Sequence, residues 1–210
     1  MKKTLATLLL LCAVCVSSWG QEVRGGFTAG MNISSPSYYA PFVGAKAGMR
    51  GDVAFRDSGS SGLFEFGLML NDKSWRYVYG DVDNIHDARL KAHALYIEVP
   101  LHAGYRWQVG PNTRVFITAG PYLAYGVAGR AKMSYEGITG RRISETVIEK
   151  LFDDAMERFD CGLGYRVGIE LKNEMQLSIE QDWGMLNFDK TSDKQRYLNR
   201  ILTLSLSYMF

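Results

Sequence analysis

Hydrophobic and polar residues alternate strictly over Leu95–Trp107, the stretch LYIEVPLHAGYRW. The odd-numbered residues are apolar, whereas the even-numbered residues include Glu98, His102 and Arg106. Successive side chains of a β-strand point to opposite faces, so this pattern predicts a strand with one apolar and one polar face. Its 13 residues exceed the roughly 5–6 of an ordinary strand and reach the about 9–11 that a tilted strand needs to cross a bilayer.

The same alternation recurs in seven other segments. They are Val23–Ile33, Phe42–Phe55, Leu63–Leu70, Arg114–Val127, Phe159–Leu171, Met175–Met185 and Leu202–Phe210. Pro121 lies inside one of them, and because proline cannot donate to a strand ladder we expect a bulge or kink there. The connections 56–62, 108–113 and 172–174 are short, whereas 71–93 and 130–158 are long. This organisation predicts an all-β fold, an eight-stranded antiparallel up-and-down transmembrane β-barrel with short periplasmic turns and longer extracellular loops.

Two barrel types fit the alternation. A soluble lipocalin-like barrel turns its apolar face inward around a ligand, whereas a membrane barrel turns it outward. The polar faces are rich in glycine and charge, and aromatic residues near the strand ends resemble the belts at membrane interfaces. We therefore expect the membrane type.

An eight-stranded barrel has an interior just wide enough for side chains to fill, so paired charges are expected to close it. A substrate path or a narrow pore is the alternative. The expected lumen charge network consists of Lys46, Arg50, Glu65, Glu98, His102, Arg106, Arg166, Glu170, Glu180 and Asp182.

The segment Ser144–Arg158 departs from the strand pattern. Its apolar residues follow the i, i+3, i+4 spacing of an amphipathic helix, and Thr146 with Glu149 fits a capping box. The helix would lie in the third external loop, either folded over the barrel rim or presenting a docking surface. The residues of such a partner surface would be Val147, Leu151, Phe152 and Trp75.

The N-terminus has the features of a secretory signal peptide. Lys2 and Lys3 precede an apolar run that is too short to span a membrane, and small residues precede Gln21. We expect residues 1–20 to be cleaved and residues 21–210 to form the barrel in the cell outer membrane.

Cleavage would remove two lysines and leave 22 basic and 22 acidic residues. The mature chain would then have no excess of positive charge that would indicate binding to nucleic acid. Cys161 is then the one remaining cysteine, which excludes an internal disulfide.

No catalytic, metal or cofactor site is expected. The three histidines, His86, His93 and His102, lack metal-ligand spacing. A lipid A deacylase would show a His-x-Ser arrangement on one barrel face, and none of the three is followed by serine at the second position. His102 could serve as a general base, but a lumen histidine within a charge network is the favoured interpretation.

Several motifs carry a family resemblance. They are YIEVPLHAGYR within Leu95–Trp107, AGPYLAYG at Ala119–Gly126, RFDCGLGYRVGIEL at Arg158–Leu171 and the terminal LSLSYMF. These stretches resemble the small outer-membrane β-barrel family that includes PorT-like and porin-family proteins, and more distantly OmpX and the OmpA barrel. The C-terminal strand resembles the signal read by the barrel-assembly machinery, with Leu204, Leu206, Tyr208 and Phe210 as its residues.

The resemblance says more about architecture than about function, because one fold hosts many functions. We expect a non-enzymatic, monomeric protein with a structural or surface-interaction role through its external loops. Its expected partners are outer-membrane lipid, the barrel-assembly machinery during biogenesis, and an extracellular or envelope protein. Resemblance to PorT implies an alternative role in secretion or envelope assembly. A narrow pore, an envelope lipid-modifying enzyme and a soluble ligand-binding barrel are further alternatives.

Overall fold

The computed structural model describes residues 22–37, 39–55, 60–82, 85–136, 142–172, 174–190 and 196–210. The expected signal peptide lies outside these residues. The elements are β1 (Glu22–Ser34), β2 (Phe42–Ala54), β3 (Ser61–Asp72), β4 (Trp75–Val82), β5 (Ile85–Gly110), β6 (Thr113–Glu136), β7 (Arg142–Ile148), α2 (Leu151–Asp154), β8 (Phe159–Leu171), β9 (Met175–Gly184) and β10 (Arg200–Met209). No helix among the described residues is long and apolar enough to span a membrane.

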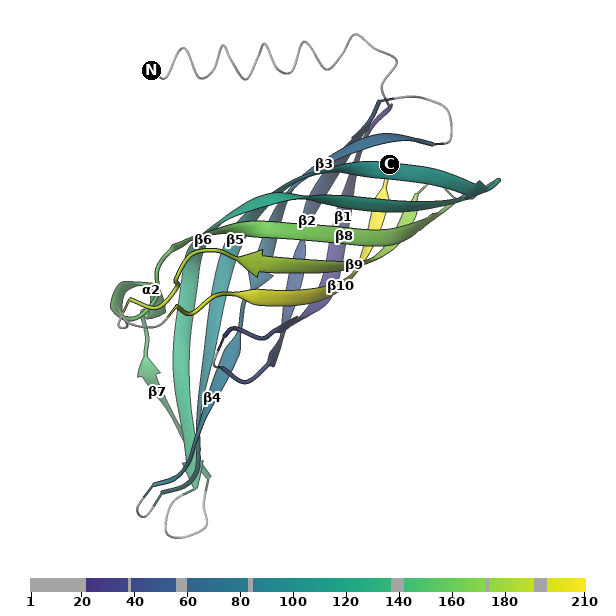
Figure 1. Ribbon diagram of the computed structural model, residues 1–210. Coiled ribbons are helices and arrows are strands. Elements are labelled where there is room, and N and C mark those ends of the chain that lie inside the picture. Colours follow the sequence, from purple (N-terminus) through teal and green to yellow (C-terminus); the bar gives the residue numbers. More distant parts are fainter. Residues whose placement is uncertain are drawn as a thin grey trace, which may run out of the picture.

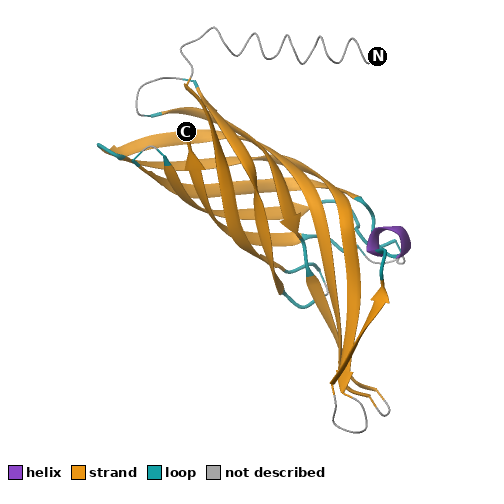
Figure 2. Cartoon of the chain, turned by 180° about the vertical axis from the view of Figure 1, so that it is seen from behind, coloured by secondary structure: helices purple, strands orange, loops and turns teal. Residues whose placement is uncertain are grey.

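Eight strands close into a ring, as the alternation predicts. Neighbours pair in the order β1, β2, β3, β5, β6, β8, β9 and β10, and every pair is antiparallel. The ring is closed by β10, which pairs with β1 from Gly26–Met209 to Ser34–Ile201. The described chain begins and ends at the same end of the barrel, which is the upper end in Figure 1 and Figure 2.

The burial pattern separates the two faces of each strand. Along β10, Leu204 is 55% exposed, whereas Thr203 on its N-terminal side is fully buried. The apolar residues of the other ring strands are likewise exposed on the outside, and the charged residues are buried within. The apolar face therefore points outward. This arrangement excludes a lipocalin-like barrel with an apolar interior.

The two long segments expected to be external loops are mostly strands. β5 and β6 extend beyond the ring, with 26 and 24 residues, and β4 and β7 pair with their extensions. The result is a four-stranded sheet, in the order β4, β5, β6, β7, at the end of the barrel opposite the chain termini (Figure 1). We call it the outer sheet, made of β4, residues 85–94 of β5, residues 128–136 of β6, and β7.

The expected helix over Ser144–Arg158 is wrong for most of its length. Ser144 to Ile148 belong to β7, and only Leu151–Asp154 are helical, as α2. The β-branched residues Thr146, Val147 and Ile148 favour an extended backbone, and the extended part of β6 supplies a strand with which they pair. Pairing with a strand therefore overrides the local helical spacing.

The bulge expected at Pro121 is also absent. β6 pairs with β8 without a shift through Pro121 and Leu163, and its register with β5 is the same on both sides of the proline. Pro121 lies on the exposed face, and the neighbouring ladder pairs maintain the alignment. The β5–β6 register shifts instead between Leu95 and Tyr96, where Val127 is the additional residue on β6.

The facing of β10 can be tested by substitution. Leu204→Arg should lower the free energy of unfolding by roughly 2–4 kcal/mol near the bilayer midplane, because it places a charge on the lipid face. Thr203→Ser, on the buried face of the same strand, should cost less. Urea unfolding of the protein in phosphatidylcholine vesicles measures both, and equal costs would contradict the assigned facing.

Candidate functional site

The barrel interior is filled by charged side chains, which come from six of the eight ring strands and from Lys73 directly after β3. The buried cations are Arg24, Lys46, Arg50, Lys73, Arg106 and Arg166, and the buried carboxylates are Asp52, Glu65, Glu98, Asp160, Glu170, Glu180 and Asp182. They form three successive clusters along the barrel. We call these the turn-end, middle and outer clusters, beginning at the end that holds the chain termini.

The turn-end cluster joins strands from opposite sides of the ring. Arg24 on β1 donates to Asp52 on β2 over 2.6 Å and to Glu170 on β8 over 2.8 Å. Arg106 on β5 lies 3.0 Å from Glu22 and 3.7 Å from Glu170. These contacts tie the first strand of the ring to strands that lie far from it in sequence.

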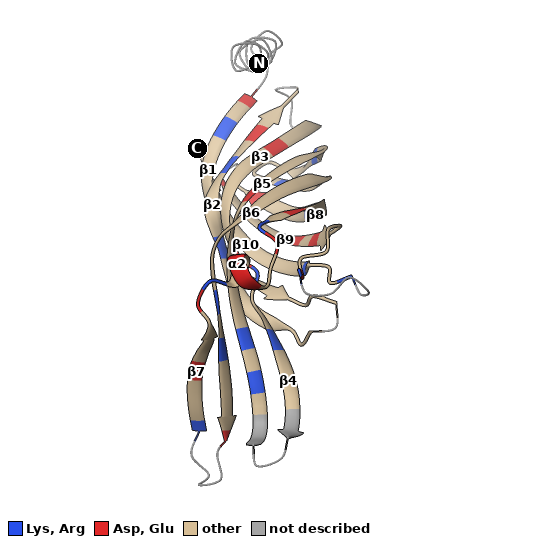
Figure 3. Cartoon of the chain, turned by 90° about the vertical axis from the view of Figure 1, so that its left-hand side faces the viewer, with Lys and Arg blue, Asp and Glu red and all other residues tan. Residues whose placement is uncertain are grey.

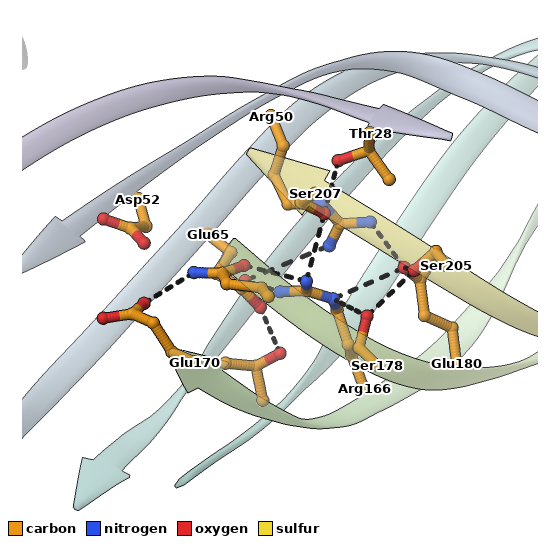
Figure 4. Close-up of polar contacts among 12 residues, drawn as sticks. Thr28, Arg50, Asp52, Glu65, Arg166, Glu170, Ser178, Glu180, Ser205 and Ser207 are labelled. Carbon is orange, nitrogen blue, oxygen red and sulfur yellow. Dashed lines mark hydrogen bonds and ion pairs between the residues drawn. The ribbon is translucent and has the colours of Figure 1, made fainter. Parts of the chain in front are cut away.

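The middle cluster crosses the lumen, as Figure 4 shows. Arg50 on β2 donates to Glu180 on β9 over 2.7 Å, and Arg166 on β8 donates to Glu65 on β3. The Arg166 Nε also lies 3.4 Å from Glu180 Oε1. Two guanidinium groups and two carboxylates from four strands thus neutralise one another inside the barrel.

The outer cluster is built around two lysines. The Lys46 ammonium lies 2.9 Å from both Glu98 and Glu180. The Lys73 ammonium lies 3.1 Å from Glu98 and 2.9 Å from Asp160. Buried charges are tolerated when each has an opposite partner and hydrogen bonds, and every carboxylate in this cluster meets a lysine.

His102 is buried on the inner face of β5, directly opposite Glu65 of β3 in the strand pairing. Both of its ring nitrogens are buried without a hydrogen-bond partner among the described residues. Gly104 and Gly120 let β5 and β6 approach closely here, because a Cβ on Gly104 would lie 1.9 Å from the Ile117 carbonyl oxygen. The described residues also contain no group of three or more His, Cys, Asp or Glu that could hold a metal ion.

An apolar cluster covers the outer end of the lumen. We call it the aromatic cap, and its buried members include Trp75, Tyr96, Tyr122, Leu151, Phe152, Met156 and Phe188, with Tyr39 and Tyr197 packed against them. The Tyr39 and Trp75 rings are 4.2 Å apart, and Tyr96 meets Phe152 edge to face at 5.2 Å. The Lys73 ammonium lies 4.5 Å from the centre of the Tyr122 ring, so cap and outer cluster are in direct contact.

Three of the four residues expected on a partner surface belong to this cap. Trp75, Leu151 and Phe152 are only 5%, 1% and 3% exposed, whereas Val147 is 48% exposed. Phe152 packs over Gly126, where a Cβ would lie 2.3 Å from the phenylalanine ring. The apolar side of this segment therefore covers the barrel mouth, and the expected partner surface is wrong for all of these residues except Val147.

The structure places all ten residues of the expected lumen network inside the barrel. Sequence reasoning missed Arg24, Asp52, Lys73 and Asp160 as network members. Asp52 and Asp160 occupy inward positions of the alternation, so the same pattern could have identified them. Lys73 lies directly after the end of β3, where the alternation no longer applies. Its side chain is held in the lumen by the tertiary contacts of the outer cluster.

Removing one member of the middle cluster should be costly. Arg166→Met leaves Glu65 buried without its closest partner, and we expect a loss of about 3–5 kcal/mol in the free energy of unfolding. Adding Glu65→Gln should recover part of that loss, because the unpaired charge is removed. Urea unfolding of the wild type, both single variants and the double variant measures the coupling, and additive costs would contradict it.

The comparison with protein families agrees with this architecture. A family model described as an outer membrane protein beta-barrel domain matches residues 14–190. A search of curated protein sequences found no match.

Three bacterial proteins are among the solved structures that this chain matches. Ail, the attachment invasion locus protein of Yersinia pestis, is 13% identical, with 90% of this chain and 99% of Ail covered and a TM-score of 0.37. Neisserial surface protein A is 14% identical, with 91% and 99% covered and a TM-score of 0.40. The N-terminal beta-barrel domain of Pseudomonas aeruginosa OprF is 14% identical, with 89% and 99% covered and a TM-score of 0.30.

Proposed function

Because this chain belongs to the family of outer membrane proteins with a beta-barrel domain, we propose that it is a non-enzymatic surface protein that binds a protein partner through its outer sheet. The observation that carries the proposal is the continuation of β5 and β6 from the barrel into that sheet. The membrane-embedded strands thereby hold the sheet in a defined position beyond the barrel. A rigid scaffold that presents a binding surface is a common arrangement in proteins.

The outer sheet offers two features that suit a protein partner. Tyr77, Val78 and Tyr79 on β4, with Ile143 and Val147 on β7, are large apolar residues exposed beyond the lipid-facing part of the barrel. In addition, β7 pairs with β6 alone among the described strands, so its other edge is available to an added strand. Exposed apolar side chains beside an open strand edge support a surface-interaction role.

The lumen supports this role over that of a pore. Paired charges fill the three clusters, and the aromatic cap covers their outer end. Ions crossing this interior would have to displace buried partners, which costs several kcal/mol for each pair broken. A closed interior leaves the external surface as the part of the molecule that can meet other molecules.

We infer that the protein is exported through a cleaved leader of residues 1–20 and assembled through its last strand. The Phe210 amide donates to the Gly25 carbonyl over 2.7 Å, and the Phe210 ring lies 5.9 Å from that of Phe27. The final residue therefore helps to close the ring. This position supports the proposal that Leu204, Leu206, Tyr208 and Phe210 are read by the barrel-assembly machinery.

Photo-crosslinking on intact cells tests the proposed role. Benzoylphenylalanine at Tyr79 or Val147 should yield adducts with a protein partner, because both side chains are exposed on the outer sheet. The matched control carries benzoylphenylalanine at Met31, which is exposed on the lipid face of β1. This position should yield no protein adduct. Equal protein adducts at all three positions, or none at the outer sheet, would contradict the proposal.

The identity of the captured partner distinguishes the proposed surface interaction from the PorT-like alternative. An extracellular protein supports the surface interaction, whereas an envelope component together with a secretion defect on gene deletion supports the PorT-like alternative.

Planar bilayer recording tests the closed lumen. The wild-type protein, inserted in folded form, should show no discrete conductance steps, since the charged clusters and the cap fill its interior. Folding is checked by faster gel migration of the unheated sample. Reproducible single-channel steps from the folded protein would favour the narrow-pore alternative.

A further inference from the structure

Four basic residues gather on the outward face of the outer sheet. We call Arg76, Lys91, Arg130 and Lys132 the basic strip. Arg76 on β4 lies directly opposite Lys91 on β5, and Lys91 in turn lies directly opposite Lys132 on β6. Arg130 lies one row nearer the barrel, opposite His93. Figure 3 shows blue bands of lysine and arginine on β4 and on the strands beside it, in the part of the sheet that extends beyond the barrel.

The register shift at Val127 brings this strip together. Up to Val127 the odd-numbered residues of β6 face outward, and beyond it Ala131 is fully buried while Arg130 is exposed. On β5 the odd-numbered residues point outward throughout. Lys91 therefore lies on the same outer face as Leu95 and Ile97, whereas Ala92 is buried. The additional residue therefore places Arg130 and Lys132 on the same face as Lys91.

The strip concentrates positive charge, and the aromatic contact that it has among the described residues is that of the Lys91 ammonium, 5.6 Å from the centre of the Phe42 ring. Directly opposite side chains on neighbouring strands have Cβ atoms about 4.5–5.5 Å apart, and like charges in such pairs are destabilising. Among the described residues, no carboxylate forms an ion pair with any of the four. Two of the acids nearby have other partners, since Asp72 contacts Ser74 and His93, and Asp153 pairs with Arg158 at 2.5 Å. An anion from outside the chain would relieve this repulsion.

The strip lies where the lipid-facing band of the barrel ends. The outward apolar series of β5 ends at Leu95, that of β6 at Val127 and Ala128, and that of β3 at Leu70. A groove of about 720 Å³ lies at this boundary. Its apolar lining includes Leu95 and Val127, and its polar lining includes Arg130, Lys150 and Arg158, with the acids Asp72, Glu149 and Asp153. One ligand that enters the groove can thus meet its apolar wall and, through Arg130, the basic strip.

We propose that the groove and the basic strip bind an anionic, phosphate-bearing lipid of the outer leaflet. Its phosphate group lies against Lys91, Arg130 and Lys132, and an acyl chain lies along Leu95 and Val127. Basic residues directly beside a membrane-spanning segment are the usual means of holding anionic head groups. The lipid-facing surface continues into the strip without interruption, which favours a lipid over a soluble anion. This inference does not depend on the proposed protein partner, which would use β4 and the edge of β7.

Native mass spectrometry tests the lipid site. The protein is purified from outer membranes and incubated in micelles that contain equal amounts of phosphatidic acid and phosphatidylcholine. The wild type should retain phosphatidic acid selectively. Lys91→Gln with Lys132→Gln should weaken its retention about 30-fold, because each basic residue at an anionic lipid surface contributes about fivefold in affinity. Binding should also weaken at 1 M salt, where the Debye length falls to about 3 Å.

The matched control is Lys172→Gln with Arg196→Gln, which removes the same charge from exposed positions that are not part of the strip. This variant should retain phosphatidic acid as the wild type does, and faster migration of unheated samples confirms that all variants are folded. Equal loss in both double variants, or equal retention of the two lipids by the wild type, would overturn the proposal. Equally tight binding of soluble glycerol phosphate would show that the site recognises phosphate alone, and would overturn its assignment to lipid.

Discussion

The pairing of β1 with β10 is the interaction on which the rest of the structure depends. The hydrocarbon core of a membrane contains no hydrogen-bond partners, so a sheet that spans it cannot leave an edge unpaired. The first and last described strands pair over nine residues and remove both edges. Once the ring is closed, each side chain of a spanning strand faces either lipid or lumen. Apolar and polar side chains must therefore alternate along every spanning strand.

Closure with eight strands then determines the chemistry of the lumen. The interior is too narrow for bulk water, so its charged groups must find partners among themselves. Their partners come from strands across the ring, as when Arg166 on β8 meets Glu65 on β3 and Arg50 on β2 meets Glu180 on β9. Slipping one strand by a single residue would turn its charges toward lipid, so the charge network disfavours alternative registers.

The alternation predicted much of the fold because it is a local property of each strand. The facing of Leu204 and Thr203, and the inward position of all ten expected network residues, follow from it directly. The outer sheet could not be predicted from the alternation. Residues 144–148 have helical spacing, yet they pair with the extended part of β6. Whether such a segment becomes helix or strand depends on the neighbour, and no property of the segment itself decides it.

The same limit applies to the aromatic cap. Trp75 and Phe152 lie in segments that the alternation places in external loops, yet both are buried in the cap.

The register shift at Val127 separates the two faces of the outer sheet. Without the additional residue, the alternation on β6 would turn Arg130 and Lys132 toward the aromatic cap, where Ala131 is now fully buried. Two cations would then lie unpaired against Leu151 and Phe152, at a cost of several kcal/mol each. The shift avoids this cost and at the same time collects the cations on the lipid-facing side. One inserted residue thus allows the same strands to carry an apolar inner face and a basic outer face.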